Sequence, residues 1–127
     1  MLNFLEKSRL SWLITIVIAI FIFYISSLSL YQVGPEIGGN TNSFVYHFFI
    51  FFWFAFFLSL SLIRGKKINL LIIVILIAAI YAGSDEFHQL FVLNRNCSFS
   101  DFLTDLAGAF FAILIYTFSI KIRKLNL

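Results

Sequence analysis

Ionisable side chains gather in one stretch of this sequence, between residues 81 and 105, and their types suit acid–base chemistry or ligand binding. Asp85, His88 and Gln89 are three and four residues apart, so a helix places them on one face, with Glu86 at its flank. A carboxylate beside an imidazole is a common pair for proton transfer. Imidazole and carboxylate together also suit Zn²⁺ or Mn²⁺, whereas carboxylates and water suit Mg²⁺.

Further polar residues flank this stretch on both sides. Asp101 and Asp105 are one helical turn apart, and His47 lies just inside an earlier apolar segment at a similar depth. Arg95 fits phosphate or carboxylate because its guanidinium donates two parallel hydrogen bonds. We therefore expect one site. Its catalytic groups would be Asp85, Glu86 and His88, and its substrate-binding groups His47, Gln89, Arg95, Asp101 and Asp105.

The same residues have a purely structural alternative. Asp101 is three residues after Ser98, the spacing of a helix capping box. Arg95 could pair with Asp85 or Asp101 only to lower the cost of burying them. The cluster would then be an ion-pair network that joins helices without binding a ligand. A divalent metal cofactor stays open, because the spacing matches no recognised metal motif, and the sequence does not decide whether the protein is an enzyme.

The elements that position these groups are expected to be membrane-spanning helices. Of the 127 residues, 61% are apolar and 12% are charged, about half the charged share of soluble domains. A soluble domain of this size has too much surface to hide so many apolar side chains. The single cysteine, Cys97, excludes an internal disulfide. The net charge of +3 is therefore better explained by membrane topology than by nucleic-acid binding.

Four apolar stretches are long enough to cross a bilayer, which takes about 20 helical residues. The expected spans are residues 10–30, 44–63, 68–92 and 101–120, which together predict an all-α four-helix membrane bundle in a single domain, 1–127. A cleaved signal peptide is disfavoured for the first stretch, because its apolar region is too long. Small-residue pairs at Ala78/Ala82 and Gly108/Ala112 predict close packing of the third and fourth spans.

The basic residues indicate how the chain is oriented. Eight of the nine fall on one side of a four-span protein: Lys7, Arg9, Arg64, Lys66, Lys67, Lys121, Arg123 and Lys124. Only Arg95 falls on the other side. By the positive-inside rule, both termini are expected to be cytoplasmic, in a multi-pass protein of the cell membrane. The polar cluster then lies near the outer face.

At these residues the sequence resembles the VanZ-like membrane protein family. The match consists of the run Asp85-Glu86-x-His88-Gln89-x-Phe91, then Arg95, Ser100-Asp101 and Asp105-x-x-Gly108. Ser26-Ser27 and His47 are weaker matches, and the resemblance covers nearly the whole chain. It departs at Ser43 and Phe44, where many relatives carry an aspartate-lysine pair, and at Asp105, where many carry asparagine.

The resemblance implies a ligand at the outer membrane face. The family takes its name from a protein linked to resistance to teicoplanin, a glycopeptide that acts on cell-wall precursors there, and resistance itself is not carried over to this chain. We expect the pocket to bind, and to be able to process, an anionic lipid-linked or cell-envelope ligand. Membrane lipids, an anionic headgroup or a lipid-linked cell-wall precursor are the expected partners, and nucleic acid is not. The alternative is a non-catalytic membrane scaffold or interaction protein.

Overall fold

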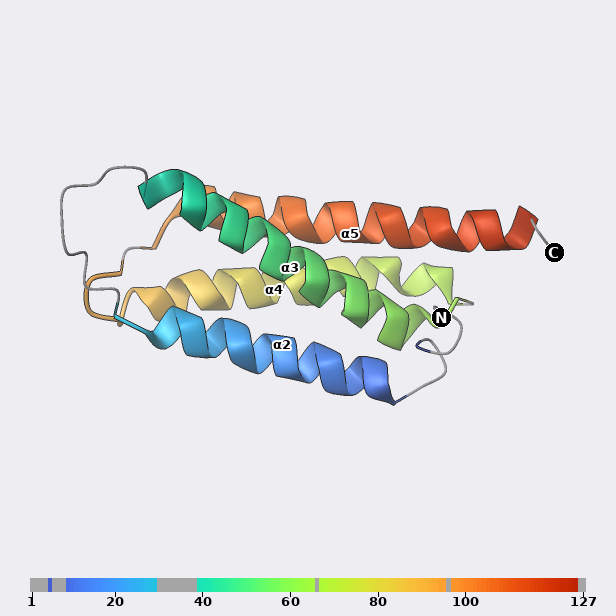
Figure 1. Cartoon of the computed structure of the whole chain (residues 1–127), viewed down its shortest axis with the longest axis horizontal. Coiled ribbons are helices and arrows are strands. Elements are labelled where there is room, and N and C mark those ends of the chain that lie inside the picture. Colours follow the sequence, from blue (N-terminus) through green and yellow to red (C-terminus); the bar gives the residue numbers. More distant parts are fainter. Residues whose placement is uncertain (1–4, 6–8, 30–38, 66, 96, 126–127) are drawn as a thin grey trace.

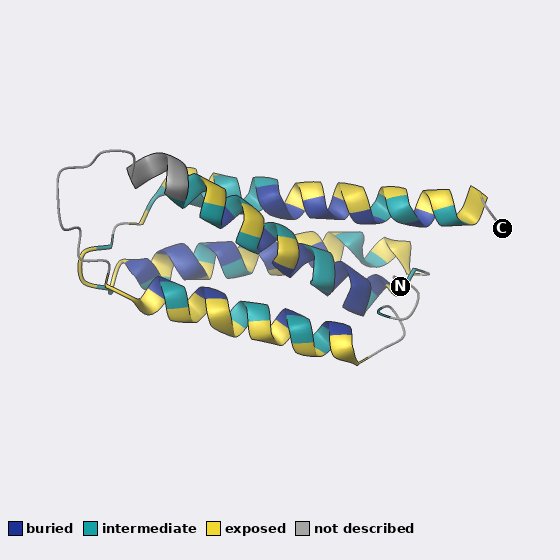
Figure 2. Ribbon diagram, in the orientation of Figure 1, coloured by how far each residue is buried: buried dark blue, intermediate teal, exposed yellow. Residues whose placement is uncertain are grey.

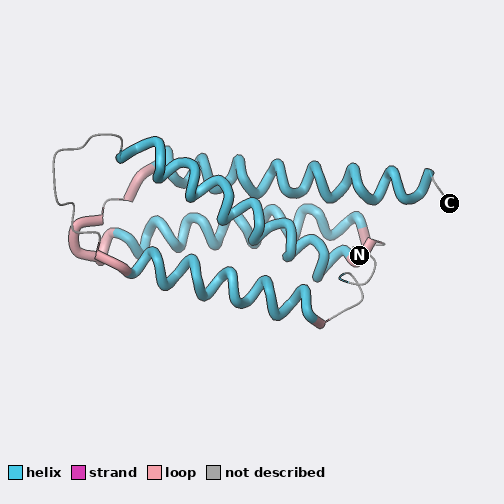
Figure 3. The backbone as a smooth tube through the Cα atoms, viewed as in Figure 1, coloured by secondary structure: helices cyan, strands magenta, loops and turns pink. Residues whose placement is uncertain are grey.

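In a computed structural model, the chain forms four long helices that lie side by side (Figure 1). The structure describes residue 5 and residues 9–29, 39–65, 67–95 and 97–125. The helices are α2 (Leu10–Ser27), α3 (Gly39–Ile63), α4 (Leu71–Gln89) and α5 (Phe99–Leu125), and the short 3-10 turn η1 (Ile68–Leu70) leads into α4. The described residues contain only helix and loop, which confirms the all-α class (Figure 3).

Each long helix is apolar enough to cross a membrane. Exposed residues lie along the outward sides of the helices (Figure 2), and many of them are large and apolar. The candidate spans are Leu10–Ser27, Ser43–Ile63, Ile68–Gln89 and Phe99–Leu125. Outward-facing residues such as Ile80, which is 71% exposed, would be costly in water and suit contact with lipid tails. The protein is therefore a multi-pass membrane protein that contacts membrane lipids.

Several helix ends differ from the expected spans: α3 begins at Gly39 rather than near residue 44, and α5 ends at Leu125 rather than near residue 120. The first helix ends at Ser27 rather than near residue 30, and the third ends at Gln89 rather than near residue 92. After Gln89 the chain continues as tight turns, with Leu90 N–H donating to Phe87 O, and Asn94 adopts a positive φ of 61°. Asparagine tolerates this left-handed conformation better than most residues, so it can turn the chain toward α5.

Helices α3 and α4 each contact the other three long helices, and the most extensive contact in the bundle is between α3 and α5. Among the described residues, α2 and α5 do not contact each other. A Cβ atom on Gly108 would lie 2.2 Å from Phe48 O on α3. Gly108 of the α5 stripe therefore lies against the backbone of α3, because a residue without a Cβ atom lets the two helices approach closely. The third and fourth spans do contact each other, as expected, but the glycine of this stripe faces α3.

The two ends of the bundle differ in chemistry. One end, called the polar end below, holds the buried residues His47, Asp85, Glu86, Gln89 and Asp105 where α3 and α5 begin and α4 ends. The other, called the basic end, carries Arg9, Arg64, Lys67, Lys121, Arg123 and Lys124. Lys7 and Lys66 lie outside the described residues. The grouping of basic residues at one end follows the sequence expectation.

Candidate functional site

The polar end buries five ionisable or amide side chains, with the Ser26 hydroxyl beside them, at a depth where apolar residues are the norm. The exposed fractions of His47, Asp85, Glu86, Gln89 and Asp105 lie between 0 and 7%. They come from α3, α4 and α5, so the bundle itself brings them together. Burying an ionisable group inside a membrane protein costs free energy unless the group is paired or binds a ligand.

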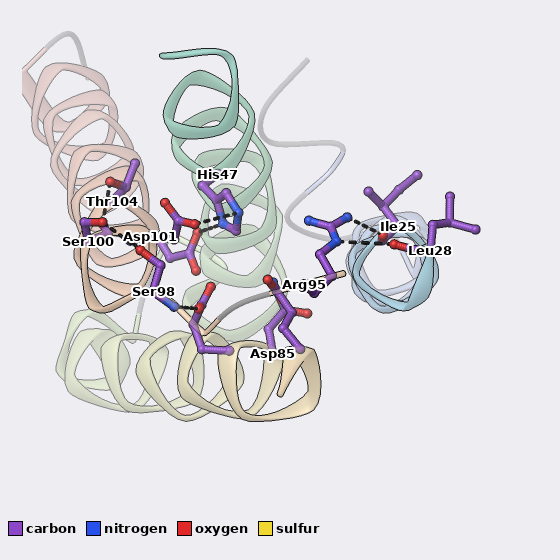
Figure 4. A network of polar contacts seen from close by, with 12 residues as sticks. Ile25, Leu28, His47, Asp85, Arg95, Ser98, Ser100, Asp101 and Thr104 are labelled. Atoms are coloured by element: carbon purple, nitrogen blue, oxygen red, sulfur yellow. Dashed lines mark hydrogen bonds and ion pairs between the residues drawn. The ribbon is translucent and has the colours of Figure 1, made fainter. Parts of the chain in front are cut away.

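His47 on α3 faces the two aspartates of α5 (Figure 4). Its Nδ1 lies 2.9 Å from Asp105 Oδ1, at hydrogen-bond distance, and its Nε2 lies 3.8 Å from Asp101 Oδ2. Asp105 is fully buried. The aspartates are one turn apart on α5, so both carboxylates reach the same imidazole. The expected depth of His47, level with these carboxylates, agrees with these distances.

Ser98 caps the start of α5, as the capping-box spacing indicates. Its Oγ accepts a hydrogen bond from Asp101 N–H at 3.3 Å. The carboxylate of Asp101 is directed instead at His47 (Figure 4). Asp101 therefore contributes its backbone to the cap and its side chain to the polar end.

Glu86 on α4 ties that helix to the segment that precedes α5. Its Oε2 accepts a 2.7 Å hydrogen bond from Ser98 N–H, while its Oε1 is buried without a partner. The thiol of nearby Cys97 is exposed, and slight desolvation and the Glu86 carboxylate raise its pKa. A raised pKa lowers the thiolate fraction, so Cys97 is a poor nucleophile here.

Asp85 and Gln89 share the other side of α4, as the four-residue spacing predicts. Gln89 Nε2 donates to Asp85 Oδ2 at 3.1 Å. Both side chains line a small pocket together with Tyr46 and His47 of α3. Tyr46 was not anticipated from the sequence, although its place directly before His47 puts a polar aromatic group at the same depth.

Arg95 closes this pocket from the loop after α4. Its Nη2 donates to Ile25 O at 2.9 Å and its Nε to Leu28 O at 3.3 Å, at the end of α2 (Figure 4). Ile25 O also accepts a hydrogen bond from Leu28 N–H, so the guanidinium adds further donors to the carbonyl oxygens at the end of α2 and caps the helix terminus. The alternative in which Arg95 pairs with Asp85 or Asp101 is wrong, because the ion pairs found among the described residues join His47 to Asp101 and Asp105.

His88 lies apart from the other candidate residues. Its Nε2 is 3.0 Å from Ser27 Oγ, and its ring stacks on Phe23 with 4.6 Å between ring centroids. Three residues turn about 300° round a helix, so His88 points about 60° away from the direction of Asp85. This difference is enough to turn its side chain toward α2. His88 is therefore on the α2 side of Asp85 and does not line the pocket.

The pocket is small and partly open to solvent, with about 10 Å³ of free space. Its walls come from α2, α3, α4 and the following loop: Ile22, Ile25, Ser26, Tyr46, His47, Asp85, Gln89 and Arg95. A cavity of about 10–15 Å³ holds one water molecule. The pocket therefore has room for about one water, and a larger ligand group would contact it from its open side.

The amino-acid sequence matches the VanZ/LLP1 family over residues 10–121. The chain belongs to the VanZ/LLP1 family. The match runs through all four candidate spans and includes every candidate site residue. Neither the curated proteins nor the solved structures contain a match to this chain.

In this VanZ/LLP1 protein the candidate residues fall into two adjoining groups that share His47. One is the pocket, with Asp85, Gln89 and Arg95. The other is the cluster of His47, Glu86 and Asp105 on three different helices, whose possible metal-ligand atoms all lie within 4.8 Å of one another. The sequence expectation of a single convergent site thus becomes two neighbouring groups. Asp101 adjoins them through His47, and His88 lies outside both.

Proposed function

We propose that this protein binds the anionic group of a membrane lipid or lipid-linked envelope ligand in the pocket at the polar end. One observation carries the proposal: hydrogen-bond donors without protein partners line a partly open pocket. The Tyr46 hydroxyl is buried and has no partner, and Arg95 uses only part of its donor capacity. Buried donors are rarely left unpaired, so such a wall favours a ligand that supplies acceptors.

Arg95 is the main recognition group in this proposal. A guanidinium has five N–H donors, and two of them reach the carbonyl oxygens of Ile25 and Leu28. Three donors are left for a phosphate or carboxylate at the pocket mouth. The contact with α2 also fixes the direction of the guanidinium, so little conformational entropy is lost when a ligand binds.

Asp85 adds selectivity to the pocket. Its Oδ2 is held by Gln89 Nε2, so the carboxylate has a fixed orientation. A carboxylate beside an arginine repels a bare anion but accepts a hydrogen bond from a hydroxyl or amine. The pocket chemistry therefore favours an anionic group that carries such a donor, as many lipid headgroups do.

The orientation of the protein is part of the same proposal. Basic residues collect at one end of the bundle, and Arg95 is at the other. By the positive-inside rule, both termini are cytoplasmic and the pocket opens near the outer leaflet. A ligand of the cell envelope would meet the pocket from that side.

Binding, rather than processing, is the function the contacts support. The acid–base pair expected from the sequence joins His88 to Asp85 or Glu86, but His88 contacts Ser27 and Phe23 outside the pocket. Glu86 accepts a hydrogen bond from Ser98 N–H.

Binding of matched short-chain lipids to the purified protein in neutral detergent tests the proposal. We expect dihexanoyl phosphatidic acid to bind more tightly than dihexanoyl phosphatidylcholine of the same chain length. Arg95→Lys should weaken phosphatidic acid binding about tenfold, because one charged hydrogen bond is worth ~1.5 kcal/mol and lysine lacks the planar fork. Isothermal titration calorimetry gives both affinities.

Arg64→Lys is the matched control. Arg64 Nε also donates to a helix carbonyl, Ser61 O at 3.1 Å, but at the basic end. It should bind phosphatidic acid like the unmodified protein. Equal affinities for the two lipids, or the same loss in both variants, would rule out the proposal. A large fall in melting temperature of Arg95→Lys without a change in lipid affinity would favour the structural alternative.

A further inference from the structure

Three buried side chains from three helices meet at the polar end, beside the pocket. His47 comes from α3, Glu86 from α4 and Asp105 from α5, with exposed fractions of 3%, 3% and 0%. One potential ligand atom from each residue lies within 4.8 Å of the others. Tetrahedral ligands bound to one ion at about 2.1 Å lie about 3.4 Å from one another, so the widest pair of these atoms has to approach by up to about 1.4 Å to hold an ion.

Both carboxylates of this group have one fixed and one unused oxygen. Glu86 Oε2 accepts from Ser98 N–H and Asp105 Oδ1 faces His47 Nδ1, whereas Glu86 Oε1 and Asp105 Oδ2 are buried with no hydrogen-bond partner. An unsatisfied buried oxygen has lost its hydration without compensation. Two such oxygens in one three-residue group favour the binding of a cation.

The charges around the group call for the same compensation. Four carboxylates, of Asp85, Glu86, Asp101 and Asp105, lie at this end. The guanidinium of Arg95 is turned to the carbonyl oxygens of α2, which leaves only His47 in ion-pair range of any of them among the described residues. Buried charges need partners or metal ions. A divalent cation offsets two carboxylates at once.

His47 is oriented as metal-binding histidines usually are. Such a histidine commonly directs its second ring nitrogen at a carboxylate that fixes the orientation of the ring. Here one nitrogen faces Asp105, and the other lies 3.8 Å from Asp101. Asp101 is then a positioning residue and Asp105 a ligand.

We propose that His47, Glu86 and Asp105 form a binding site for one divalent transition-metal ion, of the Zn²⁺ or Mn²⁺ class. One imidazole with two carboxylates suits these ions better than Mg²⁺ or Ca²⁺, which prefer oxygen ligands alone. Three protein ligands leave at least one coordination position open. The ligand set differs from the sequence expectation, in which His88 with Asp85 or Glu86 would hold a metal.

The test is direct metal binding by the full chain in detergent. Protein stripped with a chelator is titrated with Zn²⁺ or Mn²⁺, and we expect one ion per chain. Loss of an outer-shell partner weakens metal binding about 10- to 100-fold. Asp101→Asn should weaken binding by an amount within that range, and Asp105→Asn and Glu86→Gln should each weaken it by more. Asp85→Asn is the matched control, because it removes a neighbouring buried carboxylate that is not a proposed ligand. The metal affinity of this variant should stay close to that of the unmodified protein.

X-ray absorption spectroscopy of the metal-loaded, unmodified protein supplies a readout that does not depend on variants folding. A first shell with one imidazole nitrogen and the rest oxygen supports the site. The proposal is overturned if neither ion binds, if the shell contains no imidazole, or if Asp85→Asn loses as much affinity as Asp105→Asn. Arg95→Lys should bind the metal ion like the unmodified protein even though it binds phosphatidic acid more weakly. The lipid proposal and the metal proposal can therefore fail independently of each other.

Discussion

The two ends of the bundle treat their buried polar groups in opposite ways. Toward the basic end, Ser59 Oγ donates to Ala55 O and Ser61 Oγ to Phe57 O, each one turn back along α3. Thr15 likewise donates to Ser11 O, and the Tyr116 hydroxyl accepts from Gly65 N–H. Local backbone carbonyls and one loop amide therefore satisfy the buried groups there without outside help.

At the polar end the same chain leaves such groups unsatisfied. Among the described residues, the buried side chains that retain an oxygen without a partner are Ser26, Tyr46, Glu86 and Asp105, and all four are at this end. The basic end shows that this bundle can satisfy buried oxygens when structure alone is required. The contrast therefore favours a ligand-dependent site over an ion-pair network at the polar end.

Membrane topology gives the largest expected effect, an all-or-none one. If the basic end is cytoplasmic, green fluorescent protein fused after Leu125 should be fluorescent, and alkaline phosphatase at the same point should be inactive. Alkaline phosphatase fused after Asn94 is the matched control and should be active. A reversed pattern would place the pocket on the cytoplasmic side and would exclude a ligand in the outer leaflet.

Packing at the polar end gives the next largest effect. Gly108→Ala puts a Cβ against Phe48 O, so α5 must move away from α3 and Asp105 away from His47. We expect a loss of about 1–3 kcal/mol in the free energy of unfolding. Gly83→Ala is the control: its Cβ meets only Phe102 Cε2 at 3.8 Å, and it should gain about 0.5–1 kcal/mol from helix propensity. Thermal unfolding in detergent measures both, and equal melting temperatures would contradict the close crossing of α3 and α5.

Neutralising a carboxylate in metal-free protein gives the smallest effect and the sharpest contrast. Asp105→Asn removes a buried charge but keeps an oxygen that His47 can face. In excess chelator, the free energy of unfolding should therefore be unchanged or higher by up to about 1 kcal/mol. Ser59→Ala at the basic end should change it by less than about 1 kcal/mol, since only a bond to its own helix is lost. If Asp105→Asn instead loses about 3–5 kcal/mol, the cluster is structural.

The sequence by itself determined the class of protein and the general location of its polar residues. Long apolar stretches fix membrane helices because an unpaired backbone in lipid is too costly, and this holds whatever the neighbours. The four-residue spacing placed Asp85 and Gln89 on one face, and the spacing of Ser98 and Asp101 marked the start of α5. Each of these results depends on local geometry, which periodicity captures.

Only the tertiary structure decided how those residues are partnered. The sequence paired His88 with Asp85 or Glu86 and, in its structural alternative, Arg95 with Asp85 or Asp101. In the structure His88 contacts Ser27, and Arg95 contacts Ile25 O and Leu28 O. Both outcomes depend on where α2 lies, more than 60 residues away along the chain. The grouping of His47, Glu86 and Asp105 likewise depends on how three helices cross. Helical spacing fixes the direction of a side chain on its own helix, whereas its partner is set by packing between helices, which no single stretch of sequence encodes.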